Sequence, residues 1–209
     1  MRRIGITQRV EIIPSYGESR DCLDQRWSDL ALTLGFLPIP LPNISSPHSI
    51  GLIDELELDA VIFSGGNSLT TVAPDDSDAS IQRDAFEESL FSACLEKNIP
   101  TLAVCRGMQH INLLLGGNLT AIEKHVGTPH TIIPVDHTVT LPTTVNSYHN
   151  WCIPSNGLAT SLSPLGTDKA GNIEAYRHQK HKILGLMWHP EREVPFCDID
   201  IQLIKSILL

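Results

Sequence analysis

The sequence has no apolar run that approaches the roughly 20 residues needed for a membrane-spanning helix. Basic residues are also scarce: 15 Lys and Arg stand against 24 Asp and Glu, a net charge of −9. We therefore expect no broad basic surface for nucleic acid or for an anionic membrane, although an anionic substrate can still bind locally. Residues 1–30 are too polar for a secretory signal peptide, which favours a cytoplasmic location.

The spacing of the cysteines gives no sign of a metal site or of a disulfide framework. The five cysteines are scattered, odd in number, and form no CxxC motif and no Cys/His cluster with metal-ligand spacing. We therefore expect reduced thiols, no disulfide framework, no structural zinc and no cofactor.

Strand-like and helix-like segments alternate along the 209 residues, a length that suits one domain. Strands are expected at 3–7, 59–66 and 101–104, and an extended, proline-rich segment at 36–42. Helices are expected at 20–34, at 80–97 and from 106 to the Gly116-Gly117 pair. This alternation implies βαβ units. We predict a single α/β domain over residues 1–209, with a mainly parallel sheet and helices on both faces.

After residue 131 the pattern changes to short strands separated by close turns. The expected strands are 130–135, 137–141, 143–148, 173–178 and 183–188, followed by a helix at 199–209. No internal repeat, low-complexity tract or linker divides the chain. The second half is therefore expected to complete the same domain.

Cys105 stands at the end of the apolar strand "TLAV", immediately before a predicted helix. Ligands of open α/β sheets bind at the carboxyl ends of the strands, and a tight strand-to-helix turn exposes the residue at its apex. Gly107 suits the limited room in such a turn. The helix N-terminus favours a thiolate and offers N–H groups to an oxyanion. The alternative, a buried core cysteine, is the better interpretation of Cys94.

A base for this nucleophile is indicated by "LMWHPERE". His189 ends a hydrophobic strand, so it should lie at the same edge of the sheet as Cys105. Pro190 stiffens the turn, and Glu191 can accept a hydrogen bond from the imidazole and fix its tautomer. A capped strand end would look the same by itself, but the combination with the cysteine predicts a Cys-His-Glu triad.

The stretch "FSGGNS", residues 63–68, ends a third buried strand. Paired glycines bring backbone N–H groups close to a ligand, and no Walker A signature follows them. A tight turn between strand and helix would suffice to explain them. Beside a cysteine nucleophile, we expect half of an oxyanion hole here.

The segments "SGGNS", "AVCRGMQ", "VNSYHN" and "LMWHPERE", in this order, resemble the class I glutamine amidotransferase superfamily, and more narrowly its peptidase C26-like γ-glutamyl hydrolases. The resemblance covers nearly the whole chain, with Ala103 departing where many relatives have Gly. It implies a three-layer, flavodoxin-like α/β/α fold and the triad Cys105, His189 and Glu191. It also implies an oxyanion hole from the backbone amides of Gly66 and Arg106, and glutamyl-binding side chains at Gln109, Ser147, Tyr148 and His149.

Within that branch, "GITQR", "YGESRDCLDQRW" and "IEAYRH…ILGLMWHPERE" are similar to hydrolases that release glutamate from a γ-glutamylated cytidine diphosphoramidate in capsule synthesis. Arg9, after the first strand, and Arg20, expected at the start of the next helix, are then the cations available to a diphosphate. Both arginines could equally be solvent-exposed.

Alternative functions are a γ-glutamyl-γ-aminobutyrate-type hydrolase, a glutaminase subunit that supplies ammonia to a synthetase partner, or an inactive binding protein on the same fold. The intact triad argues against the last. The expected partner is a small γ-glutamyl substrate, and a homo-oligomer is left open.

Overall fold

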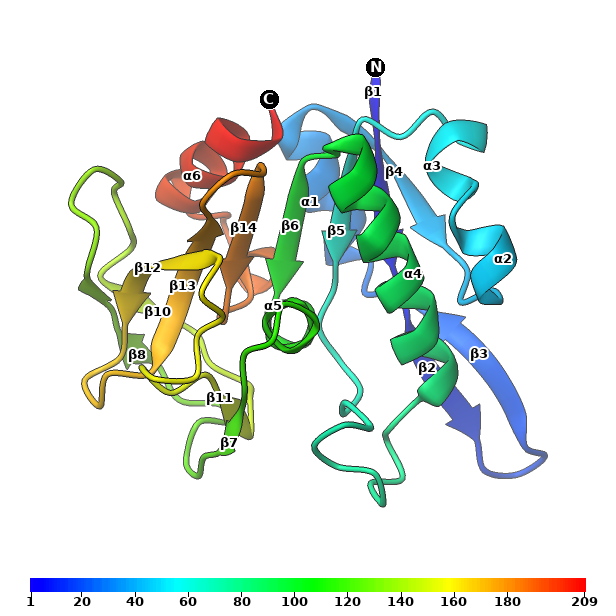
Figure 1. The fold of residues 1–209 in the computed structure, drawn as a ribbon, viewed down its shortest axis with the longest axis horizontal. Coiled ribbons are helices and arrows are strands. Elements are labelled where there is room, and N and C mark those ends of the chain that lie inside the picture. The colour runs from blue at the N-terminus through cyan, green and yellow to red at the C-terminus, as the bar shows by residue number, and fades with distance from the viewer.

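The computed structural model describes residues 1–209, apart from the side chains of Ser46 and Pro47. Its centre is an eight-stranded sheet in the order β4-β1-β5-β6-β14-β13-β12-β9 (Figure 1). The first five strands are parallel: β4 (Phe36–Leu41), β1 (Arg2–Thr7), β5 (Ala60–Phe63), β6 (Thr101–Val104) and β14 (Ile183–Leu186). The last three pair antiparallel: β13 (Ile173–His178), β12 (Leu162–Thr167) and β9 (Ile133–Pro134). The prediction of a mainly parallel sheet is confirmed, and the parallel part has the 2-1-3-4-5 order of doubly wound folds.

Helices cover both faces of the sheet, so the expected three-layer arrangement is also confirmed (Figure 1). One face packs against α1 (Arg26–Leu34) and α6 (Asp198–Leu208), and the other against α4 (Ile81–Lys97) and α5 (Arg106–Leu114). Two short helices, α2 (Ser46–Ser49) and α3 (Leu52–Glu55), lie between β4 and β5 in the chain. None of the helices that the structure describes has the length and apolar character needed to cross a bilayer.

The pattern of β5 explains why a continuous apolar run becomes a central strand. Ala60 and Ile62 belong to the core cluster under α1 and α6, whereas Val61 and Phe63 belong to the cluster under α4 and α5. All four side chains are fully buried. A strand that is covered on both faces has no polar side to present, and this is the signature of a parallel sheet.

The expectation of a helix from residue 20 is wrong. Residues 9–22 form an antiparallel hairpin of β2 (Arg9–Ile13) and β3 (Glu18–Cys22), and α1 begins only at Arg26. Gly17, with φ +70°, permits the hairpin turn. The helical periodicity had included Leu23, which precedes the helix. Arg20 consequently lies on a strand.

The second half also departs in detail from the expected strands. Outside the central sheet, the strands between residues 120 and 152 form two-residue pairs: β8 (His130–Thr131) with β10 (Thr144–Val145), and β7 (Thr120–Ala121) with β11 (Trp151–Cys152). Residues 137–141, expected as a strand, form a turn in which Asp136 accepts bonds from the backbone N–H and hydroxyl of Thr138. Strand β12 was missed because Pro164 and Gly166 interrupt its pattern, and the pairing of β12 shifts register there.

Candidate active site

Cys105 lies in a strained turn between β6 and α5. Its φ of 51° and ψ of −108° are unusual for a residue with a side chain. The room in the turn is small, since a Cβ on Gly107 would lie 2.2 Å from the Phe63 carbonyl oxygen. A strained residue between a buried strand and a helix N-terminus is the geometry that presents a nucleophile.

His189 follows β14 and lies at the same edge of the sheet. Its Nδ1 is 2.7 Å from Oε1 of Glu191, and both side chains are almost fully buried. The backbone N–H and carbonyl of His189 are both hydrogen-bonded to the Asn146 side chain, each at 2.9 Å. The orientation of the imidazole is therefore fixed from two sides.

The charge state of His189 reflects this environment. Burial by itself lowers its pKa, but the charge of Cys105, an interaction with the Cys105 sulfur and the hydrogen bond to Glu191 outweigh burial and raise the pKa to about 9. The imidazole is consequently held as a cation beside the sulfur at neutral pH. This is the protonation state that a general acid for a leaving group needs.

The turn after β5 brings backbone close to both side chains. A Cβ built on Gly65 would lie 2.7 Å from Cε1 of His189 and 3.6 Å from Cβ of Cys105, so only glycine fits between them without a shift. Gly66 has a φ of +81°. Among the described residues, no main-chain acceptor outside α5 is found for the backbone N–H of Gly66, which lies in the turn, or of Arg106, the first residue of α5.

A buried arginine that was not expected from the sequence holds this turn. The Arg83 guanidinium donates to the carbonyl oxygens of Ser64 at 2.8 Å, Gly65 at 3.1 Å and Gly66 at 2.5 Å. With these three carbonyls fixed on the α4 side, the peptide N–H groups of the turn are restricted in direction. Arg83 is a positioning residue for the turn.

Arg83 belongs to a buried charge cluster with Asp84, Glu87, Arg106 and His110. Glu87 pairs with the Arg83 Nε at 2.9 Å and also with Arg106 and His110, while Arg106 reaches Asp84. Burial opposes ionisation of Glu87, but the two guanidinium groups and His110 hold its pKa well below the usual range. The Arg106 side chain thus points into the protein. The only sequence signal was an Arg-Glu pair at i, i+4 on the apolar face of α4.

A cavity of about 300 Å³ opens beside His189 and Glu191, against the β2–β3 hairpin. Arg9 and Arg192 both line it, together with Glu11 and Trp27. The aliphatic part of Arg9 packs over Gly66, and its guanidinium pairs with Glu11. Arg192 was not predicted, although it directly follows the His-Pro-Glu motif.

The two arginines expected to bind a phosphate are not equivalent. Arg9 lines the cavity, whereas Arg20 does not. Arg20 is exposed on β3, with its guanidinium 2.7 Å from Glu18 and 2.9 Å from the Tyr16 hydroxyl. The structure therefore brings Arg9 to the site and leaves Arg20 outside it.

The side chains expected to hold the glutamyl group do not line this cavity. Gln109 donates to the Trp151 carbonyl at 2.8 Å, and Ser147 donates to the His125 carbonyl at 2.5 Å. Tyr148 contacts the His189 ring edge-on, with 5.8 Å between centroids, and the Arg192 guanidinium carbon lies 4.3 Å from the centroid of the Tyr148 ring. Tyr148 is 43% exposed and is the most accessible of these residues.

His149 is oriented differently from its neighbour. Its side chain is buried and faces three other polar groups, His125, His130 and Glu174, at donor separations within 4.8 Å. Sequence spacing gave no indication of this cluster, since its members span 50 residues. It is the one group of this kind among the described residues that could hold a metal ion.

Comparison with known proteins identifies the family of the chain. The family model of peptidase C26 matches residues 3–191 of the chain. The chain belongs to the peptidase C26 family. It is therefore an enzyme, and the resemblance drawn from the sequence is confirmed. The model covers the elements that carry Cys105, His189 and Glu191.

Relatives of this peptidase C26 member include hydrolases with different substrates. It is 36% identical over 202 residues to the γ-glutamyl-CDP-amidate hydrolase of Campylobacter jejuni, covering 95% of this chain and 94% of that protein. It is 31% identical over 112 residues to the γ-glutamyl-γ-aminobutyrate hydrolase of Escherichia coli, covering 49% and 42%. A glutamine amidotransferase structure from Thermotoga maritima superposes with a TM-score of 0.67 at 17% identity, over 98% of this chain and 83% of that one, and so shares the fold.

Proposed function

We propose that this enzyme hydrolyses γ-glutamyl-CDP-amidate to glutamate and cytidine diphosphoramidate, as a cytoplasmic step of capsule synthesis. The observation that carries the proposal is the arrangement of Cys105, His189 and Glu191 beside a cavity that holds two guanidinium groups. The match along almost the full length of the Campylobacter hydrolase supports the same substrate.

The proposed reaction begins with attack of the Cys105 sulfur on the γ-carbonyl carbon. The carbonyl oxygen becomes an oxyanion that accepts hydrogen bonds from the backbone N–H groups of Gly66 and Arg106. The C–N bond then breaks as the His189 imidazolium donates its proton to the leaving nitrogen, which leaves a γ-glutamyl thioester on Cys105. Water gives a proton to His189, attacks the thioester carbon, and releases glutamate and the thiolate.

Glu191 acts through His189. Its carboxylate, 2.7 Å from Nδ1, accepts the Nδ1–H and leaves Nε2 as the nitrogen that exchanges protons with the substrate. His189→Ala should therefore reduce kcat by several orders of magnitude, and Glu191→Gln, which keeps the shape but loses the charge, by less.

The leaving group occupies the cavity beside the hairpin in this proposal. Arg9 and Arg192 supply the positive charge for a diphosphate, and Glu11 releases Arg9 when the diphosphate binds. Glu11 and Asp24, which also line the cavity, are acceptors for ribose hydroxyls or the cytosine amino group. An uncharged leaving group would use none of these contacts.

The glutamyl group is proposed to lie on the Tyr148 side of His189. Tyr148 is exposed there and contacts both His189 and Arg192. Gln109 and Ser147 are engaged by backbone carbonyls, so contact with substrate requires their side chains to exchange partners.

The deciding experiment compares kcat/KM for glutamate release from γ-glutamyl-CDP-amidate, γ-glutamyl-γ-aminobutyrate and glutamine. We expect the nucleotide conjugate to be preferred. Equal or better turnover of γ-glutamyl-γ-aminobutyrate would assign the enzyme to that substrate instead. Turnover of glutamine that requires an added synthetase would identify an ammonia-supplying subunit.

Arg9→Ala and Arg20→Ala form a matched pair on the hairpin. Loss of a charge-assisted contact costs roughly 1.5–3 kcal/mol, so Arg9→Ala should lower kcat/KM for the conjugate by roughly 10- to 150-fold. Arg20→Ala should leave it nearly unchanged, and neither variant should affect glutamine. Equal losses in both variants would contradict the placement of the diphosphate.

Cys105→Ser tests the nucleophile against Cys197→Ser, a half-buried thiol at the start of α6. Cys105→Ser should abolish glutamate release with all three substrates, and Cys197→Ser should keep most of the activity. Retained turnover in Cys105→Ser would refute the thioester mechanism.

A further inference from the structure

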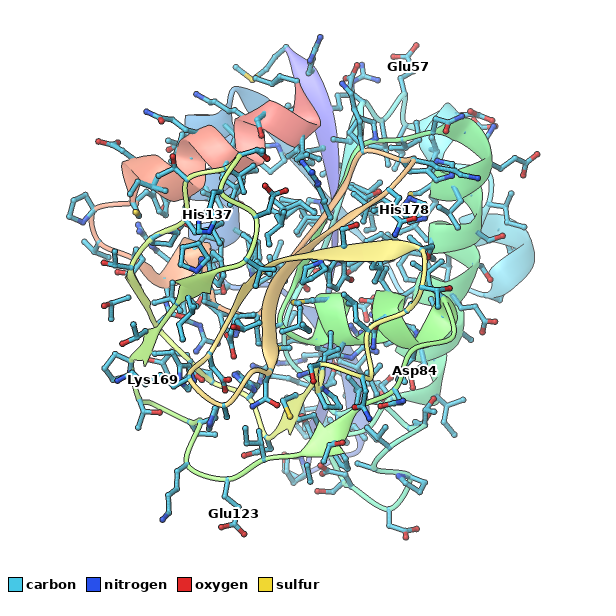
Figure 2. The ribbon with its side chains drawn as sticks, turned by 60° about the vertical axis from the view of Figure 1, so that its left-hand side comes forward. Glu57, Asp84, Glu123, His137, Lys169 and His178 are labelled. Carbon is cyan, nitrogen blue, oxygen red and sulfur yellow. The ribbon has the colours of Figure 1, made fainter. Side chains whose placement is uncertain are left out.

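Four polar side chains that do not line the cavity beside His189 converge, each from a different segment. His125 precedes β8, His130 lies on β8, His149 lies between β10 and β11, and Glu174 lies on β13. One potential ligand atom from each lies within 4.8 Å of the others. Figure 2 is turned toward this side of the molecule, with Lys169 labelled at the lower left and Glu123 at the lower edge.

Five buried polar atoms of this cluster have no hydrogen-bond partner among the described residues. They are Nδ1 of His125, Nε2 of His130, Nε2 of His149 and both carboxylate oxygens of Glu174. The shortest approach between the two most buried members, His149 Nε2 and Glu174 Oε1, is 3.8 Å, too long for a hydrogen bond. Burying five such atoms unpaired is costly, and a cation at the centre would satisfy them together.

The orientation of His149 matches that of a metal ligand. Its Nδ1 is 2.9 Å from the Trp151 carbonyl oxygen, which can only accept, so Nδ1 carries the proton. Nε2 is then the nitrogen with the free lone pair, and it faces Glu174. Metal-binding histidines are characteristically fixed in this way through the second ring nitrogen. Gln109 donates to the same carbonyl and links it to α5.

We propose that His125, His130, His149 and Glu174 bind one Zn²⁺ in a four-ligand structural site. Three imidazoles and one carboxylate are a donor set that suits zinc. Tetrahedral bonds of about 2.1 Å place donors roughly 3.4 Å apart, so the side chains close by about an ångström on binding. A surface depression of about 240 Å³, lined by His125, His130 and Asp168, gives the ion a route to the cluster.

The ion would connect three irregular segments to the sheet beside the active site. Tyr148, which contacts His189, immediately precedes His149, so the zinc would fix the position of that tyrosine. The site does not depend on which γ-glutamyl substrate the enzyme uses. Its test therefore measures metal binding without substrate.

The test uses the full chain, stripped with a chelator and titrated with Zn²⁺ and with Co²⁺ as a spectroscopic probe. Glu174→Gln and His130→Ala remove ligands. Glu123→Gln and His137→Ala, whose side chains are exposed and labelled in Figure 2, are the matched controls; Glu123 lies in the same loop as His125, and His137 follows β9. The parent and both controls should bind one Zn²⁺ per chain, melt at a higher temperature with zinc, and give the intense visible spectrum of tetrahedral Co²⁺ without a sulfur charge-transfer band.

Each ligand variant should bind Zn²⁺ at least ~100-fold more weakly, because outer contacts by themselves account for 10–100-fold effects at such sites, and should show no zinc-dependent rise in Tm. No stoichiometric binding by the parent, or equal affinity in Glu174→Gln and the parent, would overturn the proposal. Should the ligand variants fail to fold, the Co²⁺ spectrum of the parent decides, since a weak octahedral spectrum or a thiolate band excludes this site.

Discussion

Replacement of Arg83 by Met should test how much the buried charge cluster contributes to stability. Met keeps most of the side-chain length but loses the guanidinium. The variant loses the ion pair with Glu87 and the bonds to the carbonyls of Ser64, Gly65 and Gly66. Arg106 is then left as the only guanidinium facing Glu87 and Asp84.

The expected cost follows from burial. Arg83 and Glu87 side chains are both fully buried, and breaking a buried pair from one side costs roughly 3–5 kcal/mol. Part of this is offset, because burial first and then the nearby Arg106 already disfavour the charged Arg83 and lower its pKa to about 10. We expect about 3 kcal/mol of lost stability.

Arg3→Met is the matched control, since Arg3 pairs with Glu57 at 2.5 Å with side chains 40% and 76% exposed. Exposed pairs contribute about 0–1 kcal/mol. Urea unfolding of both variants gives the comparison, with Arg83→Lys as a milder change should Arg83→Met not fold. In addition, kcat of Arg83→Met should fall more than KM rises, because the turn that carries Gly66 loses its anchor. Equal unfolding midpoints for Arg83→Met and Arg3→Met would refute the argument.

Three further predictions concern the turn, the base and the core. Gly107→Ala would place a Cβ 2.2 Å from a carbonyl oxygen, so it should destabilise the protein by about 3 kcal/mol or more and abolish turnover. Gly51→Ala, whose Cβ would have its nearest atom at 3.8 Å, should change neither stability nor turnover. Urea unfolding measures the stability of both variants, and glutamate release measures their activity. Because the pKa of His189 is raised to about 9, the imidazolium persists through neutral pH, so kcat/KM should decline only above about pH 9; a decline near the ordinary histidine value would contradict the assignment. Burial raises the pKa of Asp200 to about 6; the nearby Glu193 adds to this shift and a hydrogen bond from Trp188 opposes it. The ionised carboxylate therefore lowers the stability of the folded protein above that pH, by up to about 3 kcal/mol. Asp200→Asn, which keeps the acceptor for Trp188, should therefore be more stable than the parent at pH 8 and similar to it at pH 4, as thermal unfolding at the two pH values would report.

Features that depend on a few adjacent residues could be predicted from the sequence. The strand–cysteine–helix turn was predicted from "TLAVCRG", and the structure shows the strained backbone and the crowding at Gly107 that such a turn requires. The strand before His189, and the position of Glu191 two residues after it, also depend only on adjacent residues and could be predicted in the same way. The parallel part of the sheet followed from apolar runs such as "AVIF", because a strand covered on both faces carries no polar alternation.

The pattern of apolar residues predicted the wrong element where the spacing of a helix runs on into a neighbouring segment, and it missed a strand whose pattern is interrupted. Leu23 continues the apolar spacing of the α1 residues, and this spacing predicts a helix where the hairpin strand β3 lies. The antiparallel β12 was missed because Pro164 and Gly166 are tolerated only where the ladder is irregular.

Tertiary structure alone decided which charged and polar side chains meet. Arg9 and Arg20 have the same character in the sequence, and only the hairpin puts one in the cavity and pairs the other with Glu18. The Arg83 guanidinium reaches three carbonyls of a turn 17 to 19 residues away in the chain. The cluster of His125, His130, His149 and Glu174 likewise gathers side chains from four separate segments. Such contacts have no periodic signature, because the positions of their members depend on how whole elements pack and not on the spacing of residues along one element.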